Sequence, residues 1–138
     1  MKKRDKELLE LELSKLPAII LNAGDDAVKR FLEFFTASIR NKNTRLAYAR
    51  AIGKFFVWCE GRGLDLFSIK PISVAAYIEQ HQGSPASIKQ HLSAIKQLFD
   101  YLLVGQIVAS NPASPVKAPK HIAKKGKTPV LTAEEARI

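Results

Sequence analysis

Apolar side chains recur at the spacing of an α-helix through most of this 138-residue chain, which limits the folds open to it. Residues 25–39, 43–60 and 85–104 each place apolar residues at i, i+3 and i+4, and residues 74–78 repeat the pattern briefly. No segment alternates apolar and polar residues as a half-buried strand does. The sequence therefore predicts an all-α fold in which four or five helices pack against one another.

Residues that cap or interrupt helices mark the ends of these stretches. The candidate N-caps are Asp25 or Asp26, then Asn43 or Thr44, then Ser73, and finally Ser84 followed by Pro85 at a first helical position. Gly61 or Gly63 can adopt the left-handed conformation that ends the second helix, and the fourth helix fades near Gly105. These positions predict helices joined by short loops.

The pattern divides the chain into four parts. Residues 1–22 form an arm, in which a leucine-rich helix over 3–16 ends at Pro17, and residues 23–111 form the main helical domain. Residues 112–130 are rich in proline and lysine, which predicts an extended basic linker. In residues 131–138, Thr132 and Glu135 form a capping box that begins a further helix, and we expect this helix to open another domain.

Positive charge is concentrated in the middle of the chain. The net charge is +9, and residues 40–127 hold fourteen cations against four anions, whereas residues 1–39 hold seven of each. Such a field favours polyanions such as nucleic acid, although many proteins are basic without binding one.

No apolar run is long enough to cross a bilayer, no signal peptide is recognisable, and there is one cysteine. We therefore expect a cytoplasmic protein without a membrane partner.

The second helix carries cations on faces that differ in their expected role. Its core side is formed by Tyr48, Ile52, Phe55, Phe56 and Cys59, which fall on one arc when residues are placed at 100° steps. Arg50 and Lys54 lie roughly opposite that arc, and Lys54 further along is open to interpretation as solvated charge. Arg45 falls on the core arc in the first turn, where we expect its stem to follow apolar surface and its guanidinium to reach the helix mouth beside Asn43 and Thr44.

The fourth helix repeats this arrangement. Lys89 and Lys96 are seven residues apart and share a flank, while Ser84, Ser87 and Gln90 crowd the first turns. Such side chains can donate to phosphates or base edges, but they equally fit helix capping and solvated charge. Because two helices share polar first turns and cations outside the core face, a nucleic-acid surface explains the pattern better than helix capping and solvated charge do.

No catalytic or metal-binding constellation is recognisable. His81, His91 and His121 lack ligand spacing with one another or with Cys59, and His91 fits a packing role near the core. Cys59 on the core face is expected to be a small buried apolar residue. The sequence predicts no cofactor, no metal and no small-molecule substrate.

Taken together, "NTRLAYARAIGKFFVWCEGRGL", "ISVAAYIEQ", "SPASIKQHLSAIKQLFDYLLVGQIVASNP" and "TPVLTAEEAR" resemble the N-terminal core-binding domain of tyrosine recombinases, the phage integrase and Xer-like family of site-specific DNA recombinases. The resemblance covers residues 25–138 and rests on the order and spacing of these pieces. It implies a SAM-like four-helix orthogonal bundle that forms half of a clamp around double-stranded DNA and assembles with other recombinase protomers. It leaves the arm over 1–16 without a counterpart.

The resemblance also implies where DNA would be contacted. The implied contacts are Asn43, Thr44, Arg45, Arg50, Ser84, Ser87, Lys89, Gln90 and Lys96, together with the linker lysines Lys117, Lys120, Lys124, Lys125 and Lys127. The catalytic residues of the family belong to the following domain, so Tyr48, Tyr77 and Tyr101 match core-binding positions and are not the nucleophile. This chain is then a non-catalytic part of a recombinase.

Two other functions fit the same residues. A helical protein–protein interaction module would use the leucine-rich arm to pair with a partner helix. A free-standing DNA-binding regulator would use the same cations but would leave the lysine linker and the final capping box without a role.

Overall fold

The computed structural model describes residues 16–119, and this part of the chain is helical throughout its regular structure. Its elements are α2 (Ala18–Leu21), α3 (Asp25–Glu33), the π-helical turn η1 (Phe34–Ser38), α4 (Lys42–Gly61), the 3₁₀ turn η2 (Leu66–Ser68), α5 (Pro71–Gln80) and α6 (Pro85–Val104). The described residues form no strand, so the all-α prediction is confirmed for them. The leucine-rich helix predicted over 3–16, except its last residue, and the capping box at Thr132 lie outside the described residues.

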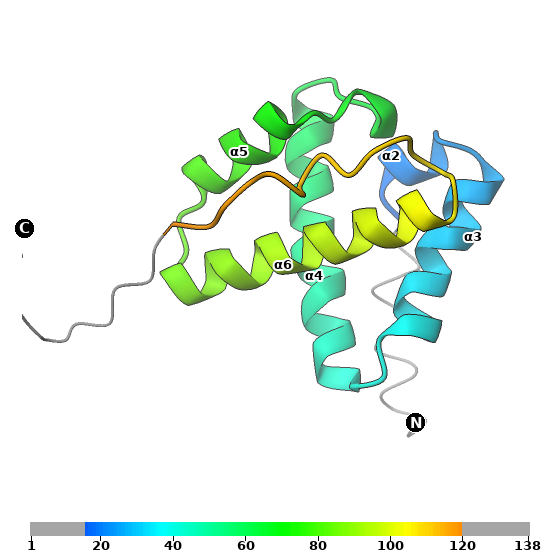
Figure 1. Ribbon diagram of the computed structural model, residues 1–138, viewed down its shortest axis with the longest axis horizontal. Helices are drawn as coiled ribbons and strands as arrows, with labels where there is room; N and C mark the ends of the chain where they lie inside the picture. Colours follow the sequence, from blue (N-terminus) through cyan, green and yellow to red (C-terminus); the bar gives the residue numbers. More distant parts are fainter. Residues whose placement is uncertain (1–15, 120–138) are drawn as a thin grey trace, which may run out of the picture.

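Two long helices set the architecture. Figure 1 shows α4 running along one direction and α6 crossing it, with α3 beside both and α5 on the other side of the crossing. The side chains of Phe35, Phe55, Phe56 and Phe99 are completely buried between these helices. Burying a side chain of this size contributes about 1.5–3 kcal/mol, so the crossing holds the bundle together. Cys59 is also fully buried, as predicted.

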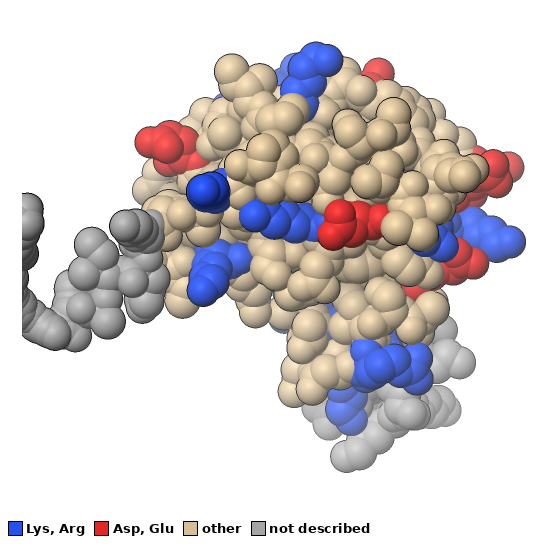
Figure 2. Space-filling view, viewed as in Figure 1, with Lys and Arg blue, Asp and Glu red and all other residues tan. Residues whose placement is uncertain are grey.

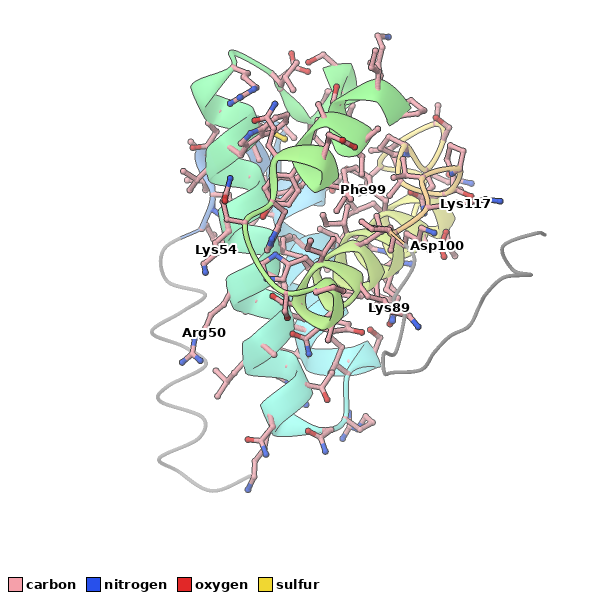
Figure 3. All side chains as sticks on the ribbon, turned by 90° about the vertical axis from the view of Figure 1, so that its left-hand side faces the viewer. Arg50, Lys54, Lys89, Phe99, Asp100 and Lys117 are labelled. Atoms are coloured by element: carbon pink, nitrogen blue, oxygen red, sulfur yellow. The ribbon has the colours of Figure 1, made fainter. Side chains whose placement is uncertain are left out.

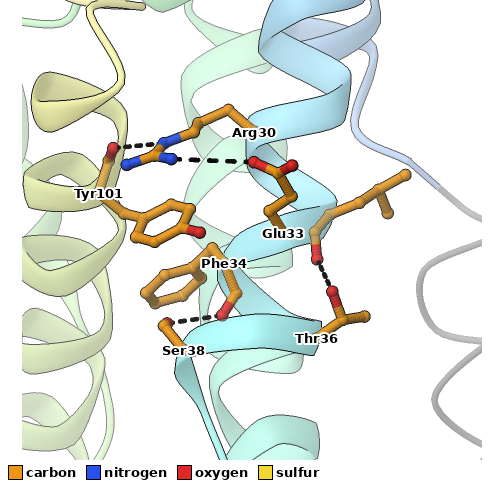
Figure 4. Close-up of polar contacts among 7 residues, drawn as sticks. Arg30, Glu33, Phe34, Thr36, Ser38 and Tyr101 are labelled. Carbon is orange, nitrogen blue, oxygen red and sulfur yellow. Dashed lines mark hydrogen bonds and ion pairs between the residues drawn. The ribbon is translucent and has the colours of Figure 1, made fainter.

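The segment that follows α3 differs from the sequence prediction. The periodicity predicts a regular helix to Ile39, but residues 34–38 form a π-helical turn, which buries both Phe34 and Phe35. The wider turn changes which backbone groups pair, and two side-chain hydroxyls donate to backbone carbonyls there. Thr36 Oγ1 donates to the Leu32 carbonyl at 3.0 Å, and Ser38 Oγ donates to the Phe34 carbonyl at 2.7 Å (Figure 4).

The N-cap of α4 lies earlier than the sequence suggested. Asn41, rather than Asn43 or Thr44, caps the helix, because its side-chain oxygen accepts a hydrogen bond from the Thr44 amide at 2.9 Å. Asn43 and Thr44 therefore lie inside the first turn. The other end agrees with the prediction, since Gly63 adopts the left-handed conformation with φ 72°.

Of the N-caps predicted for α5 and α6, one is wrong and the other is confirmed. Ser73 was predicted to cap α5, but the helix begins at Pro71, and the Ser73 hydroxyl instead accepts from the Lys70 amide at 3.2 Å. For α6 the prediction is confirmed. Ser84 Oγ accepts from the Ser87 amide at 3.1 Å, and Pro85 is the first helical residue.

Arg30 attaches the C-terminal end of α6 to α3. Its Nε donates to the Tyr101 carbonyl at 2.8 Å, and its guanidinium carbon lies 3.6 Å from the centre of the Tyr101 ring. Glu33 lies 3.8 Å from the same guanidinium (Figure 4). Arg30 is thus held at three points, and its basic group is used for packing.

The Arg30 side chain also explains the residue that follows α6. The left-handed position that ends this helix is Gln106, with φ 63°, and not the glycine before it. Gly105 has an ordinary negative φ, but a Cβ atom there would come within 3.0 Å of three Arg30 side-chain atoms. Gly105 therefore leaves room for the Arg30 side chain, which a Cβ atom at this position would displace from its partners.

Replacing Gly105 by alanine is expected to lower the free energy of unfolding by about 1–3 kcal/mol, the range for overpacking, since the added methyl group displaces Arg30 from its partners. Urea denaturation followed by circular dichroism measures the change. Gly61→Ala is the matched control, because a Cβ atom there meets nothing within 4 Å. An equal loss of stability in the two variants would contradict the close contact.

The segment after α6 packs on the bundle. Asn111 donates from Nδ2 to the Lys96 carbonyl at 3.0 Å and to Asp100 Oδ1 at 2.7 Å, and its own Oδ1 accepts from the Ala113 amide at 2.9 Å. Ala113 and Val116 are buried, and the segment runs back beside α6 toward the start of that helix (orange in Figure 1). The stretch predicted as an extended linker from 112 thus begins against the bundle instead of in solvent.

Candidate nucleic-acid interface

The residues predicted to contact DNA occupy three places. Asn43, Thr44, Arg45 and Arg50 belong to α4, while Ser84, Ser87, Lys89, Gln90 and Lys96 belong to α6 or its cap, and Lys117 belongs to the packed C-terminal segment. Lys120, Lys124, Lys125 and Lys127 lie outside the described residues. All the described members except Arg45 are at least partly exposed.

Arg45 does not have the placement that the sequence suggested. Its side chain is buried, with 5% exposure, and both Nε and Nη2 donate to the Ile39 carbonyl, at 3.1 and 2.5 Å. This carbonyl ends the π-helical turn and has left the helical pairing, so the guanidinium satisfies a buried acceptor. The guanidinium does lie near the start of α4, as predicted, but it is covered and used to join η1 to α4, so its burial disagrees with the predicted contact to DNA.

The crossing of α4 and α6 carries a polar cluster that sequence analysis did not identify. Tyr48 Oη lies 3.3 Å from Ser93 Oγ, and Gln97 Nε2 donates to both oxygens at 3.1 Å. Tyr48 was assigned to the core, yet it is only half-buried because its hydroxyl emerges between the helices. The spacing of Ser93 and Gln97, one helical turn apart, was the available signal.

Gln90 extends this polar row toward the start of α6. It lies three residues before Ser93 and seven before Gln97, so the three side chains share one face of the helix. Because Ser93 and Gln97 meet α4 through Tyr48, this face of α6 is turned toward the N-terminal half of α4. The two N-terminal halves continue past the crossing as the arms of an angle (Figure 1).

A second row on α6 is basic. Lys89 and Lys96 lie two turns apart on the flank that meets the C-terminal segment, since Asn111 bonds the Lys96 carbonyl. Figure 3 shows Lys117 on the same side of the bundle as Lys89. The Asn111 contacts therefore bring a cation from the C-terminal segment to the lysine flank of α6. Asp100, which Asn111 also bonds, lies between Lys89 and Lys117 in Figure 3, so this flank carries one acid among its cations.

Arg50 does not join this group. Figure 3 shows Arg50 and Lys54 projecting from the far side of α4, away from Lys89 and Lys117. Both side chains border a separate apolar hollow on that side. The cations predicted for one DNA surface thus divide between two sides of the bundle.

Acidic residues are missing where the two helices cross. Residues 34–59, which include the crossing half of α4, contain five cations and no acid, and residues 80–99 of the α5–α6 loop and α6 contain two cations and no acid. Figure 2 shows lysine and arginine without acidic groups at the lower end of the molecule, where α4 begins, whereas an acidic group lies beside the basic groups higher on that face. The electrostatic field of this corner therefore attracts anions.

Two histidines fix the loop that begins α6. The Gly83 amide donates to His81 Nδ1 at 2.9 Å, so the neutral His81 ring carries its proton on Nε2. That nitrogen lies 3.0 Å from His91 Nδ1, which accepts the bond, and Tyr77 Oη lies 3.4 Å from the same atom. His91 is 8% exposed, so the prediction of a satisfied packing histidine is confirmed.

This geometry predicts a pH dependence of stability. Burial, followed by the nearby His81 and Lys54, lowers the pKa of His91 below its ordinary 6.5. The unfolded chain then binds more protons than the folded chain below that pH, so stability is complete above about pH 6.5 and falls as the pH drops through the folded pKa. Urea denaturation between pH 7.5 and 5 is expected to show this loss, and His91→Gln should remove most of it. An unchanged pH dependence in His91→Gln would contradict the assignment.

Other kinds of site find no support among residues 16–119. Within that range no three histidine, cysteine or acidic side chains gather to hold a metal ion. Burial raises the pKa of the Cys59 thiol to about 12, so this sulfur is unsuited to act as a nucleophile. Over the same residues no helix is long and apolar enough to span a bilayer.

Comparison with known proteins identifies the family of the helical domain. Residues 28–105 match the family described as "Phage integrase, N-terminal SAM-like domain". The match begins in α3 and ends just after α6, so it contains the helical crossing and both histidines. No solved structure matches the chain.

Curated relatives are tyrosine recombinases. The chain is 29% identical over 111 residues to tyrosine recombinase XerC of Leptospira interrogans, a match that covers 77% of this chain and 36% of the relative. It is 30% identical to the putative tyrosine recombinase TTE1313 of Caldanaerobacter subterraneus, covering 81% of this chain and 39% of that protein. It is also 30% identical to tyrosine recombinase XerD of Chlorobaculum tepidum, covering 67% and 32%. The chain thus spans about a third of the length of these relatives.

Proposed function

Since this chain belongs to the phage integrase N-terminal SAM-like domain family, we propose that it binds duplex DNA as the clamp domain of a tyrosine-type site-specific recombinase. The observation that carries the proposal is the acid-free corner between the N-terminal halves of α4 and α6. Helix α6 presents the polar row Gln90–Ser93–Gln97, which begins in its N-terminal half, and α4 presents its first turn with Asn43 and Thr44.

The polar row of the corner and the lysine flank beside it suit different parts of DNA. Amide and hydroxyl groups such as those of Gln90 and Ser93 can both donate to and accept from base edges, and a major groove about 12 Å wide admits an α-helix. The lysine flank formed by Lys89, Lys96 and Lys117 suits phosphates, because a long flexible ammonium is attracted by charge without demanding one geometry. The helix therefore offers a base-reading row beside a phosphate-binding row.

Arg45 and Arg50 are not included in the proposed interface. Arg45 is buried against Ile39, and Arg50 lies on the other side of α4. The linker residues Lys120, Lys124, Lys125 and Lys127 continue directly from the segment that carries Lys117, and we include them as further phosphate contacts. Strand cleavage and assembly with other protomers are assigned to the recombinase as a whole, and this chain supplies DNA binding without catalysis.

Fluorescence anisotropy with a labelled duplex of about 30 base pairs tests the proposal across a salt series. At low salt we expect a Kd in the micromolar range or somewhat weaker, with a slope of log K against log salt between about −3 and −6, because each neutralised phosphate contributes about −0.9. The lysines named above supply up to seven such contacts. Undetectable binding at low salt, or equal binding to polyglutamate, would overturn the proposal.

A further inference from the structure

An apolar hollow lies on the side of α4 that faces away from the proposed DNA surface. Its volume is about 630 Å³, and its walls include Leu16, Pro17, Phe31, Ala49 and Val57. Val57 is 66% exposed, although it lies more than a turn from the end of a 20-residue helix whose other apolar residues are largely covered. A hollow of this kind on one side of a helix suits a second apolar helix face.

Small residues make close approach possible along this side of α4. Ala49 and Gly53 are one turn apart, and both line the hollow. Glycine in the middle of a helix costs about 1 kcal/mol relative to alanine, and none of the described atoms lies within 4 Å of where a Gly53 Cβ would be. Local packing among the described residues therefore does not explain Gly53, whereas an approaching backbone does.

We propose that the N-terminal segment 3–15 of the same chain docks as a helix in this hollow. The segment ends at the hollow itself, because the next residues, Leu16 and Pro17, form part of its wall. The segment carries Leu8, Leu9, Leu11 and Leu13, which can pack against the apolar walls of the hollow. Thirteen helical residues extend about 20 Å at 1.5 Å each, and the wall residues of α4 from Ala49 to Glu60 cover about 17 Å, so the lengths agree.

Charge also favours this occupant. Segment 3–15 holds four cations and four anions, but its leucine-bearing part, residues 7–13, carries three acids and no cation. Arg50 and Lys54 border the α4 side of the hollow, and Glu60 lies farther along the same helix. Acidic side chains beside the leucines can pair with these two cations once the leucines are buried. The assignment gives Arg50 a role on the arm surface, which is separate from the DNA surface on α6.

Covalent attachment selects the chain's own arm over a second copy. The hollow begins where the arm ends, so the local concentration of the arm is set by a linker of almost no length and exceeds that of any free copy in solution. The inference does not depend on DNA binding, because no residue of the hollow belongs to the proposed DNA surface.

Hydrogen exchange of the full chain, measured by mass spectrometry or NMR, tests the docking. We expect amides of residues 5–13 to exchange at least about tenfold more slowly than in an unstructured peptide. Val57→Asp should abolish this protection while leaving that of α6 unchanged, and the matched control Val104→Asp, which alters a valine with 76% exposure at the end of α6, should retain it. Preserved protection in α6 shows that Val57→Asp has folded.

Three results would overturn the inference. The first is exchange of residues 5–13 at unstructured rates in the unaltered chain. The second is protection that Val57→Asp and Val104→Asp leave equal. The third is protection that disappears on tenfold dilution, which would assign the hollow to a second copy of the chain. If Val57→Asp lowers arm protection in chain that still binds DNA normally, the two surfaces are independent, as proposed.

Discussion

Replacing both Lys89 and Lys117 by glutamate is expected to weaken duplex binding about 100-fold at low salt. Each substitution removes one phosphate contact and places a carboxylate beside the phosphates, which together cost about 1.4 kcal/mol, or a factor of ten, per position. The two side chains lie on the same side of the bundle (Figure 3), so one DNA molecule would meet both. Anisotropy titrations of the variant and the unaltered chain measure the ratio.

The control for this experiment carries the same change in net charge. Lys29 and Lys70 are exposed, and they lie on α3 and directly before α5, at the end of α5 that is remote from the start of α6. Lys29→Glu with Lys70→Glu should weaken binding by less than about fivefold, through the long-range field alone. Equal losses in the two double variants would mean that total charge, and not this surface, determines binding.

Replacing Arg45 by methionine is expected to lower the free energy of unfolding by about 2–4 kcal/mol. The substitution keeps most of the buried stem but removes both donors to the Ile39 carbonyl, and a buried acceptor left without a partner costs about 1–3 kcal/mol on top of the lost charged hydrogen bonds. Urea denaturation at neutral pH measures the loss.

Arg40 provides the comparison for this prediction. Its side chain is exposed, and its hydrogen bond to the Thr36 carbonyl is long, at 3.5 Å. Arg40→Met should change stability by about 0.5 kcal/mol or less. A stable Arg45→Met variant with weakened DNA binding would restore Arg45 as a surface contact and contradict its structural role.

The helices themselves could be predicted from the sequence because helical periodicity is local information. Phe31 and Phe35 recur at the interval that one helical face requires, and Ser84 followed by Pro85 announces the start of α6. The cap of α4 was predicted at Asn43 or Thr44 and lies at Asn41, because all three residues are good caps within four positions. Which of them caps α4 depends on where the preceding turn ends.

Details that depend on contacts between helices could not be predicted from the sequence. Arg45 is buried because the π-helical turn releases the Ile39 carbonyl beside it, and no periodicity announces that turn. Tyr48 falls on the core arc, but the angle at which α6 crosses α4 brings its hydroxyl to the surface beside Gln97. Lys117 reaches the lysine flank only because Asn111 turns the chain back along α6.

The most direct measurement of the central claim is an NMR titration of the full chain with a short duplex. The side-chain amide signals of Gln90 and Gln97 and the backbone amides of residues 42–48 and 84–97 should shift, because these groups border the proposed DNA surface. Signals of α2 and of residues 53–60 beside the apolar hollow should stay in place. Shifts confined to the Arg50 and Lys54 side of α4, with Gln90 and Gln97 unmoved, would contradict the account.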